Sequence, residues 1–492
     1  MTSGMNIRRA VILWSQSVMK HLTGIPLVAI GFVNAIVVVV SLVTSLILVR
    51  SLPKENYGQL VFFYAGFGLL RLLMNLGLGL SVNRDISAAE QETARLQTIF
   101  YSMLLSRLGS IIIILTTIPL FMIIATRPFL QYIVFAAVTA SLADFFHAVI
   151  AGSRNTRHIA MMTGVQPFSY ALLIIVLMIL RRTAPEILMF YFGISFMLML
   201  LLGVTLVVKS GLLHLPTRSD FSIQYMRQSI GFVIPVYGAT LLSQVWTSAA
   251  TGVLGWLGLF QASAEFGVVF NMISIPVSVS SPTLMTTFLP QISHLYSTGK
   301  QDAIQEQIKN AVRLFTSVYV WGAILLFSFS EIILGILFGQ SYVATAPYLT
   351  LLSPAPLILS ALPIFTLSLV AVGRPWYSLI GLSAQLSVLL GSIFLAGNAI
   401  TIGLLCWAVL LSGVAGLVVQ WFLARRVLRM SLLPTRTFQL VIVGLLFALG
   451  LRLLVTSLGV IPSLWHVVIG VLFTLVYWVM VSSKHVWRPA LI

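Results

Sequence analysis

Long apolar runs alternate with short polar stretches along almost the whole chain. A helix needs about 20 apolar residues to cross the hydrocarbon core of a bilayer. Fourteen runs reach that length, so we predict an all-α polytopic membrane protein with fourteen transmembrane helices. The runs begin near residues 26, 57, 98, 128, 159, 186, 229, 262, 314, 344, 375, 399, 438 and 461.

The positive charges are distributed unevenly between the two sides of the predicted membrane. Fourteen crossings place both termini on one side, and that side receives 20 of the 28 lysines and arginines. The other side receives 5, while Arg71, Arg107 and Arg452 lie within apolar runs. Lys and Arg accumulate in cytoplasmic loops, so both termini are expected to be cytoplasmic.

Composition agrees with a membrane protein and excludes several other classes. Hydrophobic residues make up 59% of the 492 residues and charged residues only 8%, too few to cover a soluble protein of this size. The net charge of +17 does not indicate a nucleic-acid partner, because the basic residues stand in small groups between apolar runs. Cys406 is the only cysteine, so neither a disulfide nor a cysteine metal site is expected. No P-loop motif is present, and Thr298-Gly299-Lys300 is interpreted as a turn.

Two landmarks recur at the same spacing and suggest an internal repeat. Pro26 and Pro235 are 209 residues apart, and so are Tyr57-Gly58 and Phe266-Gly267. We predict two six-helix lobes related by a pseudo-twofold axis along the membrane normal, although chance similarity in an apolar sequence is the alternative. The lobes are expected at 1–208 and 209–430, with two extra helices at 431–492. The ends of the second and eighth runs also match, as NRDIS (83–87) and LPQIS (289–293).

Polar residues form a stripe on the second apolar run, which spans Tyr57 to Val82. Tyr64, Arg71 and Asn75 fall on one helical face, with Arg71 near the middle of the run. Further stripes occur on the first, seventh and eighth runs. We predict a hydrated central cavity between the lobes, and the alternative is that small and hydroxyl residues only pack helices together. The predicted substrate-binding residues are Asn34, Tyr64, Arg71, Asn75, Gln244, Asn271 and Ser274.

The charged residues within or beside the runs suggest specific roles. The guanidinium of Arg71 can donate two parallel hydrogen bonds to a phosphate, or it can pair with a carboxylate or carbonyl inside the bundle. Arg107 has apolar helical neighbours and is expected to snorkel or to pack between the lobes. Asp144 and Glu265 are candidates for gating or coupling; capping a helix or pairing with a loop arginine is the alternative for both. No metal site is expected.

The tenth apolar run contains three prolines, at positions 354, 356 and 363. Proline removes a backbone donor and clashes with the preceding turn, so this run is expected to form a kinked or hinging helix.

Several short segments recur in a characteristic order along about the first 350 residues. These segments are LVRSLPKENYG (48–58), NLGLGLSVNR (75–84), Pro235, the turn at 265–267, FLPQIS (288–293) and EIILGILFGQSY (331–342). In order and spacing, rather than in one diagnostic motif, they resemble the polysaccharide-repeat (Wzx-type) flippases of the multidrug, oligosaccharidyl-lipid and polysaccharide exporter superfamily. One departure is Pro53, where a glycine is usual.

This resemblance implies fourteen helices in two lobes and a non-enzymatic transport function. The implied cargo is an undecaprenyl-pyrophosphate-linked oligosaccharide, an O-antigen (lipopolysaccharide) or exopolysaccharide repeat unit. It would move from the cytoplasmic to the periplasmic leaflet of the bacterial inner membrane by alternating access. The implied partners are the lipid-linked oligosaccharide, membrane lipids and other polysaccharide assembly proteins. No cofactor is expected, and coupling to protons, sodium or the membrane potential is left open.

Three other functions fit the composition less well. A cation-coupled multidrug exporter of the same superfamily would need an acid deep in the first or seventh run, and neither run has one. A membrane glycan polymerase, ligase or glycosyltransferase needs catalytic groups on a large outer loop, whereas the predicted outer loops are short. A scaffold protein that transports nothing would not need polar stripes on four helices.

Overall fold

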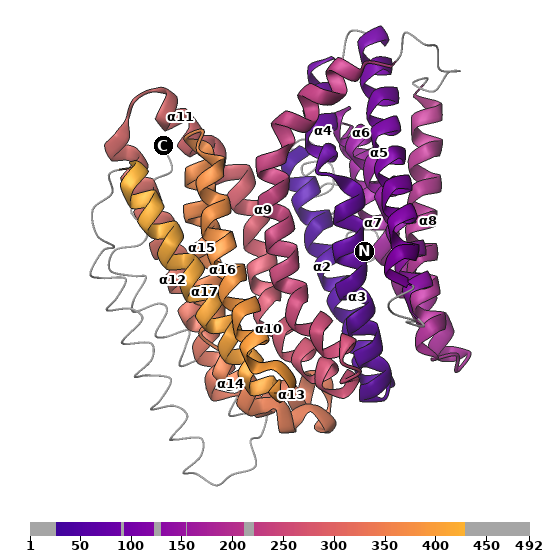
Figure 1. Ribbon diagram of the computed structural model, residues 1–492, viewed down its shortest axis with the longest axis vertical. Coiled ribbons are helices and arrows are strands. Elements are labelled where there is room, and N and C mark those ends of the chain that lie inside the picture. The colour runs from indigo at the N-terminus through magenta and orange to yellow at the C-terminus, as the bar shows by residue number, and fades with distance from the viewer. Residues whose placement is uncertain (1–25, 90–92, 123–128, 154, 211–220, 429–492) are drawn as a thin grey trace, which may run out of the picture. The chain divides into compact units, whose positions relative to one another are not determined.

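The computed structural model describes residues 26–89, 93–122, 129–153, 155–210 and 221–428, and within them it contains helices and no strands (Figure 1). In a bilayer a helix satisfies its own backbone hydrogen bonds, which is why long apolar runs adopt it. The elements are α2 (Pro26–Ser51), α3 (Lys54–Asn75), α4 (Leu78–Ala88), α5 (Thr93–Met122), α6 (Leu130–Gly152), α7 (Thr156–Ile179), α8 (Pro185–Lys209), α9 (Ile223–Trp256), α10 (Phe260–Thr283), the π-helix η2 (Leu284–Phe288), α11 (Leu289–Ser297), α12 (Gln301–Ser328), α13 (Ser330–Phe338), the 3-10 helix η3 (Gln340–Thr345), α14 (Ala346–Leu352), α15 (Ala355–Ala371), α16 (Pro375–Ala396), the 3-10 helix η4 (Gly397–Ala399) and α17 (Ile402–Leu428).

Each of the first twelve predicted spans contains a long helix or a bent helix pair. Within the described ranges, 9 helices are long and apolar enough to cross a membrane, or 10 when the bent pair counts as one span. The prediction of an all-helical multi-pass membrane protein is therefore confirmed. The two last predicted spans, from 438 and 461, lie outside the described residues, so the count of fourteen stays a prediction.

The described residues divide into two compact units. The first unit holds the described residues up to Leu52 together with Gly66–Tyr237, and the second holds Pro53–Ala65 together with those from Gly238 onward. One boundary lies between α2 and α3, and the other two fall inside α3 and α9. The predicted lobes at 1–208 and 209–430 stay a prediction. Sequence landmarks mark where helices begin, whereas compactness is set by what each helical turn packs against, so the two divisions need not coincide.

Small side chains hold the helices of the first unit close together. In this unit α6 packs against α8 and α4, and α2 and α8 both pack against α7. The α6 face contains Ala136, Ala137, Ala140 and Ala143, each 0% exposed. Close helix packing in lipid depends on such small residues, because apolar side chains gain little by leaving an apolar solvent.

The second unit is built around α15, which packs against α10, α12, α16 and α17. Its core contains Ile308, Ile364, Leu369 and Ala424, all fully buried. The predicted kink in the tenth run is confirmed, because the segment 340–352 and α15 meet at 47°. The predicted turn before α12 is confirmed as well, since Gly299 adopts a φ of 71° there.

The second predicted span is not one continuous helix. Its helix α3 ends at Asn75, and the chain passes through Leu76 (φ 46°) and Gly77 (φ 66°) before α4 begins. Arg71 therefore lies in the last turns of α3, and its expected position in the middle of an unbroken helix is wrong. The apolar residues of NLGLGL predict a continuous helix, although its glycines allow the backbone to turn there.

The corresponding part of the eighth span is also followed by a short helix. After α10 and η2 the chain forms α11, just as α4 follows α3. Both short helices carry the segments NRDIS and LPQIS that matched in the sequence. This agreement supports the predicted repeat, whose symmetry stays a prediction.

Candidate functional site

The break after α3 leaves backbone carbonyl groups without helical donors. The last carbonyls of any helix lack an intrahelical partner and must be satisfied otherwise. In the first unit the Tyr237 hydroxyl donates to the Leu72 carbonyl at 3.1 Å, and the Ser110 hydroxyl donates to the Met74 carbonyl at 2.7 Å. A Cβ atom on Gly77 would lie 2.5 Å from Val233 Cγ1, so glycine is required at the break on steric grounds as well.

Beside this helix end, Arg71 forms a bidentate salt bridge with Asp144 of α6. Its Nε donates to Asp144 Oδ2 at 2.7 Å, and its Nη2 donates to Oδ1 at 2.6 Å. Asn75 Nδ2 donates to the same Oδ2 at 2.8 Å. Arg71 and Asn75 thus share a helical face, as their spacing indicated, and the carboxylate-partner alternative for Arg71 is the one observed. Asp144 pairs with an arginine within a helix and not with a loop arginine.

A second arginine, Arg107 of α5, is buried in the same cluster. Its side chain is 1% exposed, and its Nη1 donates to the Met74 carbonyl at 3.3 Å and to the side-chain oxygen of Asn75. A weaker contact joins Nη1 to Ser141 Oγ at 3.5 Å. The Nε atom is buried and has no hydrogen-bond partner among the described residues.

The expectation that Arg107 snorkels or packs between lobes is wrong, because its contacts lie inside the first unit. Its neighbours on α5 are apolar, so they do not indicate that Arg107 belongs to a polar cluster. One signal was available: Ser110, three residues later, donates to the same Met74 carbonyl as Arg107 and so shares its face. The acceptor itself is a main-chain atom, which the pattern of side chains does not reveal.

The two arginines differ in access. The Arg71 side chain is 34% exposed and that of Asp144 18%, whereas Arg107 is enclosed. Phe67 and Phe196 lie within 5.7 and 5.1 Å of the Arg71 guanidinium carbon, at distances typical of cation–π contacts. No described residue accepts a hydrogen bond from Arg71 Nη1. Arg71 is thus engaged through Nε and Nη2 while its side chain stays partly exposed.

The cluster as a whole has an excess of positive charge. It contains the guanidiniums of Arg71 and Arg107 and the single carboxylate of Asp144. His147, one turn along α6, is in contact with Thr163 of α7 at 3.3 Å from Nε2. Two cations and one anion in a largely enclosed site favour the binding of a further anion.

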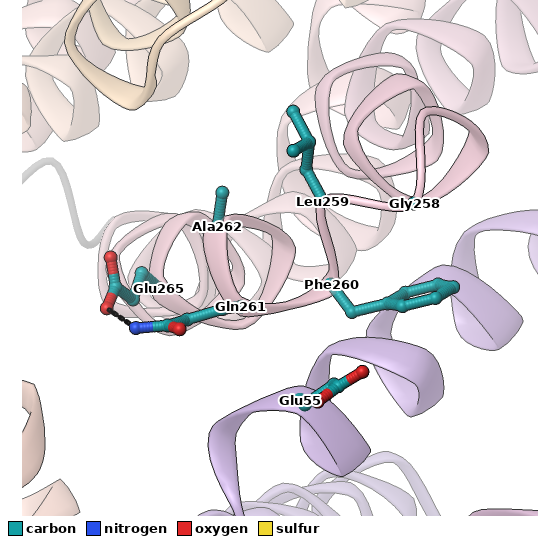
Figure 2. A pocket seen from close by; sticks show the side chains of 7 residues that line it. All are labelled: Glu55, Gly258, Leu259, Phe260, Gln261, Ala262 and Glu265. Atoms are coloured by element: carbon teal, nitrogen blue, oxygen red, sulfur yellow. Dashed lines mark hydrogen bonds between the residues drawn. The ribbon is translucent and has the colours of Figure 1, made fainter.

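Glu265 lies in the second unit and is paired. Lys54 Nζ donates to its Oε1 at 2.6 Å, with side-chain exposures of 21% for Lys54 and 16% for Glu265. Gln261 Nε2 also approaches this carboxylate, at 3.5 Å (Figure 2). Lys54 further lies over the ring of Tyr342, at 5.2 Å. The partner is a lysine at the start of α3, not the loop arginine that the alternative specified.

An open pocket of about 420 Å³ lies beside this pair. Figure 2 shows Glu55 of α3 facing the first turn of α10, with Gln261 and Glu265 along that helix. The remaining lining comes from the loop between α9 and α10 and from the first residues of α10: Gly258, Leu259, Phe260 and Ala262.

Three other predicted binding residues lie on α9 and α10 of the second unit. Gln244 is half-buried and donates from Nε2 to Ser248 Oγ at 2.9 Å. On α10, Ser274 Oγ donates to the carbonyl of Asn271 at 3.3 Å, so these two residues are adjacent. Their roles in binding stay predictions.

Asn34 and Tyr64 are not part of the Arg71 cluster. Asn34 is exposed on α2 in the first unit. Tyr64 belongs to the second unit, where its ring meets that of Phe63 edge to face at 5.5 Å. Within the first unit the structure therefore brings Arg71, Asn75 and Asp144 together. The expectation that all of them line one cavity stays a prediction.

Comparison with known proteins gives a family match over more than half of the chain. The model of a family described as "Polysaccharide biosynthesis protein" matches residues 27–296. A search of curated proteins found no match.

Solved structures of membrane transporters have a similar fold. The lipid II flippase MurJ in an inward closed conformation aligns with a TM-score of 0.66 and 12% identity, over 92% of this chain and 98% of its own. An inward-facing multidrug resistance MATE family transporter of the MOP superfamily aligns with a TM-score of 0.63 and 13% identity, over 80% and 94%. A mutant of the Vibrio cholerae MATE transporter VcmN aligns with a TM-score of 0.54 and 16% identity, over 84% and 98%. At these identities the likeness establishes the fold.

Proposed function

Because the chain belongs to the polysaccharide biosynthesis protein family, we propose that it is a flippase for a lipid-linked oligosaccharide. The family and the fold are those of a multi-pass membrane transporter, not of an enzyme. The proposed cargo is an undecaprenyl-pyrophosphate-linked O-antigen or exopolysaccharide repeat unit. It is moved from the cytoplasmic to the periplasmic leaflet of the bacterial inner membrane by alternating access, with both termini cytoplasmic.

The observation that carries this proposal is that Arg71 is both paired and partly exposed. A guanidinium within an apolar helix is costly unless it has a partner or contacts water. Arg71 has both a partner, Asp144, and a side chain that is 34% exposed. No described residue accepts a hydrogen bond from its Nη1 atom. A pyrophosphate oxygen is a suitable ligand for this position, since arginine binds phosphate through charge-assisted hydrogen bonds.

The remaining predicted residues are assigned roles in binding the sugar and in gating or coupling. Asn34, Gln244 and Asn271 are proposed to hydrogen-bond sugar hydroxyls, while Tyr64 and Ser274 extend the polar lining. Asn75 supports the Arg71 pair, and Asp144 and Glu265 act in gating or coupling. The prenyl chain stays in lipid, because each buried CH₂ group contributes about 0.8 kcal/mol to membrane association.

A cation-coupled multidrug exporter is the second candidate, and the likeness to MATE transporters favours it. Such a protein needs an acid that exchanges a cation with solvent. In the first unit Asp144 lies within α6 and is engaged by Arg71 and Asn75. This engagement favours an anionic cargo that competes for Arg71.

Transport in reconstituted vesicles tests the proposal. Full-length protein is placed in liposomes with a fluorescent undecaprenyl-pyrophosphate oligosaccharide, and the fraction reaching the opposite leaflet is measured with a membrane-impermeant quencher. Arg71→Ala is expected to slow translocation at least about tenfold, because a charge-assisted hydrogen bond contributes about 1.5–3 kcal/mol. Arg182→Ala is the matched control, since Arg182 is exposed in the loop before α8.

The outcomes separate the two candidates. Translocation that requires the protein and fails in Arg71→Ala supports the flippase. Normal translocation by Arg71→Ala would remove the anion-site proposal. Export of cationic dyes by the wild type, without movement of the lipid-linked sugar, would favour the multidrug exporter.

A further inference from the structure

The buried guanidinium of Arg107 lacks a counter-ion of its own. The acceptors that it contacts are the neutral Met74 carbonyl, the Asn75 side-chain oxygen and, at 3.5 Å, the Ser141 hydroxyl. Its Nε is buried without a hydrogen-bond partner among the described residues. Burying a charge with incomplete pairing is costly, so this arrangement needs a reason beyond packing.

Asn75 stands between this guanidinium and the carboxylate of Asp144. Its amide nitrogen donates to Asp144 Oδ2 at 2.8 Å, while its amide oxygen accepts from Arg107 Nη1. The opposite charges of Arg107 and Asp144 attract each other across this amide. One neutral side chain therefore links the anion to a second cation on another helix.

An anionic cargo bound to Arg71 would change the pairing of charges among Arg71, Asp144 and Arg107. Asp144 occupies the Nε and Nη2 edge of Arg71, and a pyrophosphate beside it would place like charges next to each other. The enclosed Arg107 cannot reach the cargo, since its side chain is 1% exposed. It can, however, receive the carboxylate that the cargo displaces.

We propose that Arg107 is a positioning residue that accepts the Asp144 carboxylate when a prenyl pyrophosphate binds Arg71, with Asn75 moving out from between them. This inference rests on the proposed function and deepens it. Asp144 pairs with Arg71 in the cargo-free state and with Arg107 in the cargo-bound state. No carboxylate is left unpaired in either state, and the cluster gains its missing anion from the cargo. Arg107 thus raises affinity for the cargo without touching it.

A double-mutant cycle on binding tests the exchange. Full-length protein in nanodiscs is titrated with farnesyl pyrophosphate, with farnesol as the phosphate-free control ligand. Arg107→Met is expected to weaken pyrophosphate binding about tenfold, within the usual range of coupling energies. In an Asp144→Asn background the same substitution is expected to have no effect, because no carboxylate needs a new partner. Arg107→Lys keeps the charge and is expected to recover most of the affinity.

This cycle distinguishes positioning from a merely structural role. A structural or directly binding Arg107 would weaken binding equally in both backgrounds, and that result overturns the inference. If the wild type binds farnesyl pyrophosphate no better than farnesol, the proposed function and this inference fail together. If Arg71→Ala abolishes binding while the cycle is additive, the exchange alone fails.

Infrared difference spectroscopy gives a second readout that does not depend on the folding of Arg107→Met. Addition of farnesyl pyrophosphate to wild type is expected to shift a carboxylate stretching band, assigned to Asp144 by its absence in Asp144→Asn. An unshifted band at saturating ligand overturns the proposal. Arg107→Lys is expected to keep the shift, because a cation is still present to receive the carboxylate.

Discussion

Gly58 of α3 lies directly against the backbone carbonyl of Phe260 in the second unit. A Cβ atom built on Gly58 would lie 1.8 Å from the Phe260 oxygen and 2.5 Å from its carbonyl carbon. The obstructing atoms belong to the backbone, so neither can move aside as a flexible side chain would. This contact explains why the segment LPKENYG ends in glycine.

The first prediction concerns this contact. Gly58→Ala is expected to destabilise the protein by about 2 kcal/mol, as overpacked sites do. Gly252→Ala is the matched control on α9, because no atom lies within 4 Å of its added Cβ. Thermal unfolding of the purified protein in detergent measures both. Equal midpoints for the two variants would contradict the close approach.

The second prediction follows from the charge count around Asp144. Asp144→Ala leaves two buried or half-buried guanidiniums without an anion and is expected to lose about 3 kcal/mol of stability. Arg71→Ala leaves one cation and one anion and is expected to lose clearly less. Unfolding by graded addition of a denaturing detergent measures both losses. The ranking is the result to check: a larger loss for Arg71→Ala would show that Asp144 does not serve both arginines.

The third prediction tests the Lys54–Glu265 pair. Both side chains are mostly buried, so removal of either one leaves a charge with poor solvation. The double variant Lys54→Met with Glu265→Gln is expected to be more stable than the sum of the single losses indicates, by about 1 kcal/mol. Gln261→Ala is the control, because its contact with Glu265 is long, at 3.5 Å. Additive losses would mean that the two charges do not interact in the membrane.

The fourth prediction concerns topology and uses the single cysteine. Cys406 is fully buried in α17, so the wild type is expected to react slowly with maleimides. Lys300→Cys and Arg182→Cys replace exposed residues on opposite predicted sides. A membrane-impermeant maleimide is expected to label Arg182→Cys in intact spheroplasts and Lys300→Cys only after permeabilisation. The reverse pattern would invert the proposed orientation.

Hydrophobic runs located the helices well because a span in lipid must be apolar and helical whatever it packs against. Proline likewise located the bend before α15, since its effect on the helix is local. The break between α3 and α4 is not predictable from hydropathy, because leucine alternates with glycine there and the hydropathy average includes both. Leu76 and Gly77 adopt positive φ angles there, and Gly77 lies against Val233 and Tyr237 of α9, a tertiary contact that no local pattern contains.

The site was only partly predictable for a similar reason. Helical spacing correctly placed Arg71 and Asn75 on one face, because that relationship lies within one helix. Their shared partner Asp144 lies 73 residues from Arg71 on another helix, and periodicity cannot select one acid among several. The environment of Arg107 is not predictable from its own helix, which is apolar around it, because its acceptors come from α3 and from Ser141 of α6.

The Met74 carbonyl has a consequence for genetic work on this protein. It accepts hydrogen bonds from Arg107 and Ser110, and it is a main-chain group that every substitution at position 74 preserves. Alanine scanning will therefore count Met74 as a packing residue only. The role of this carbonyl is revealed only when the backbone itself is altered. An insertion before Leu76, for instance, would move the end of α3 by one residue. Deletion and insertion scanning is thus the mutagenesis strategy that suits this cluster.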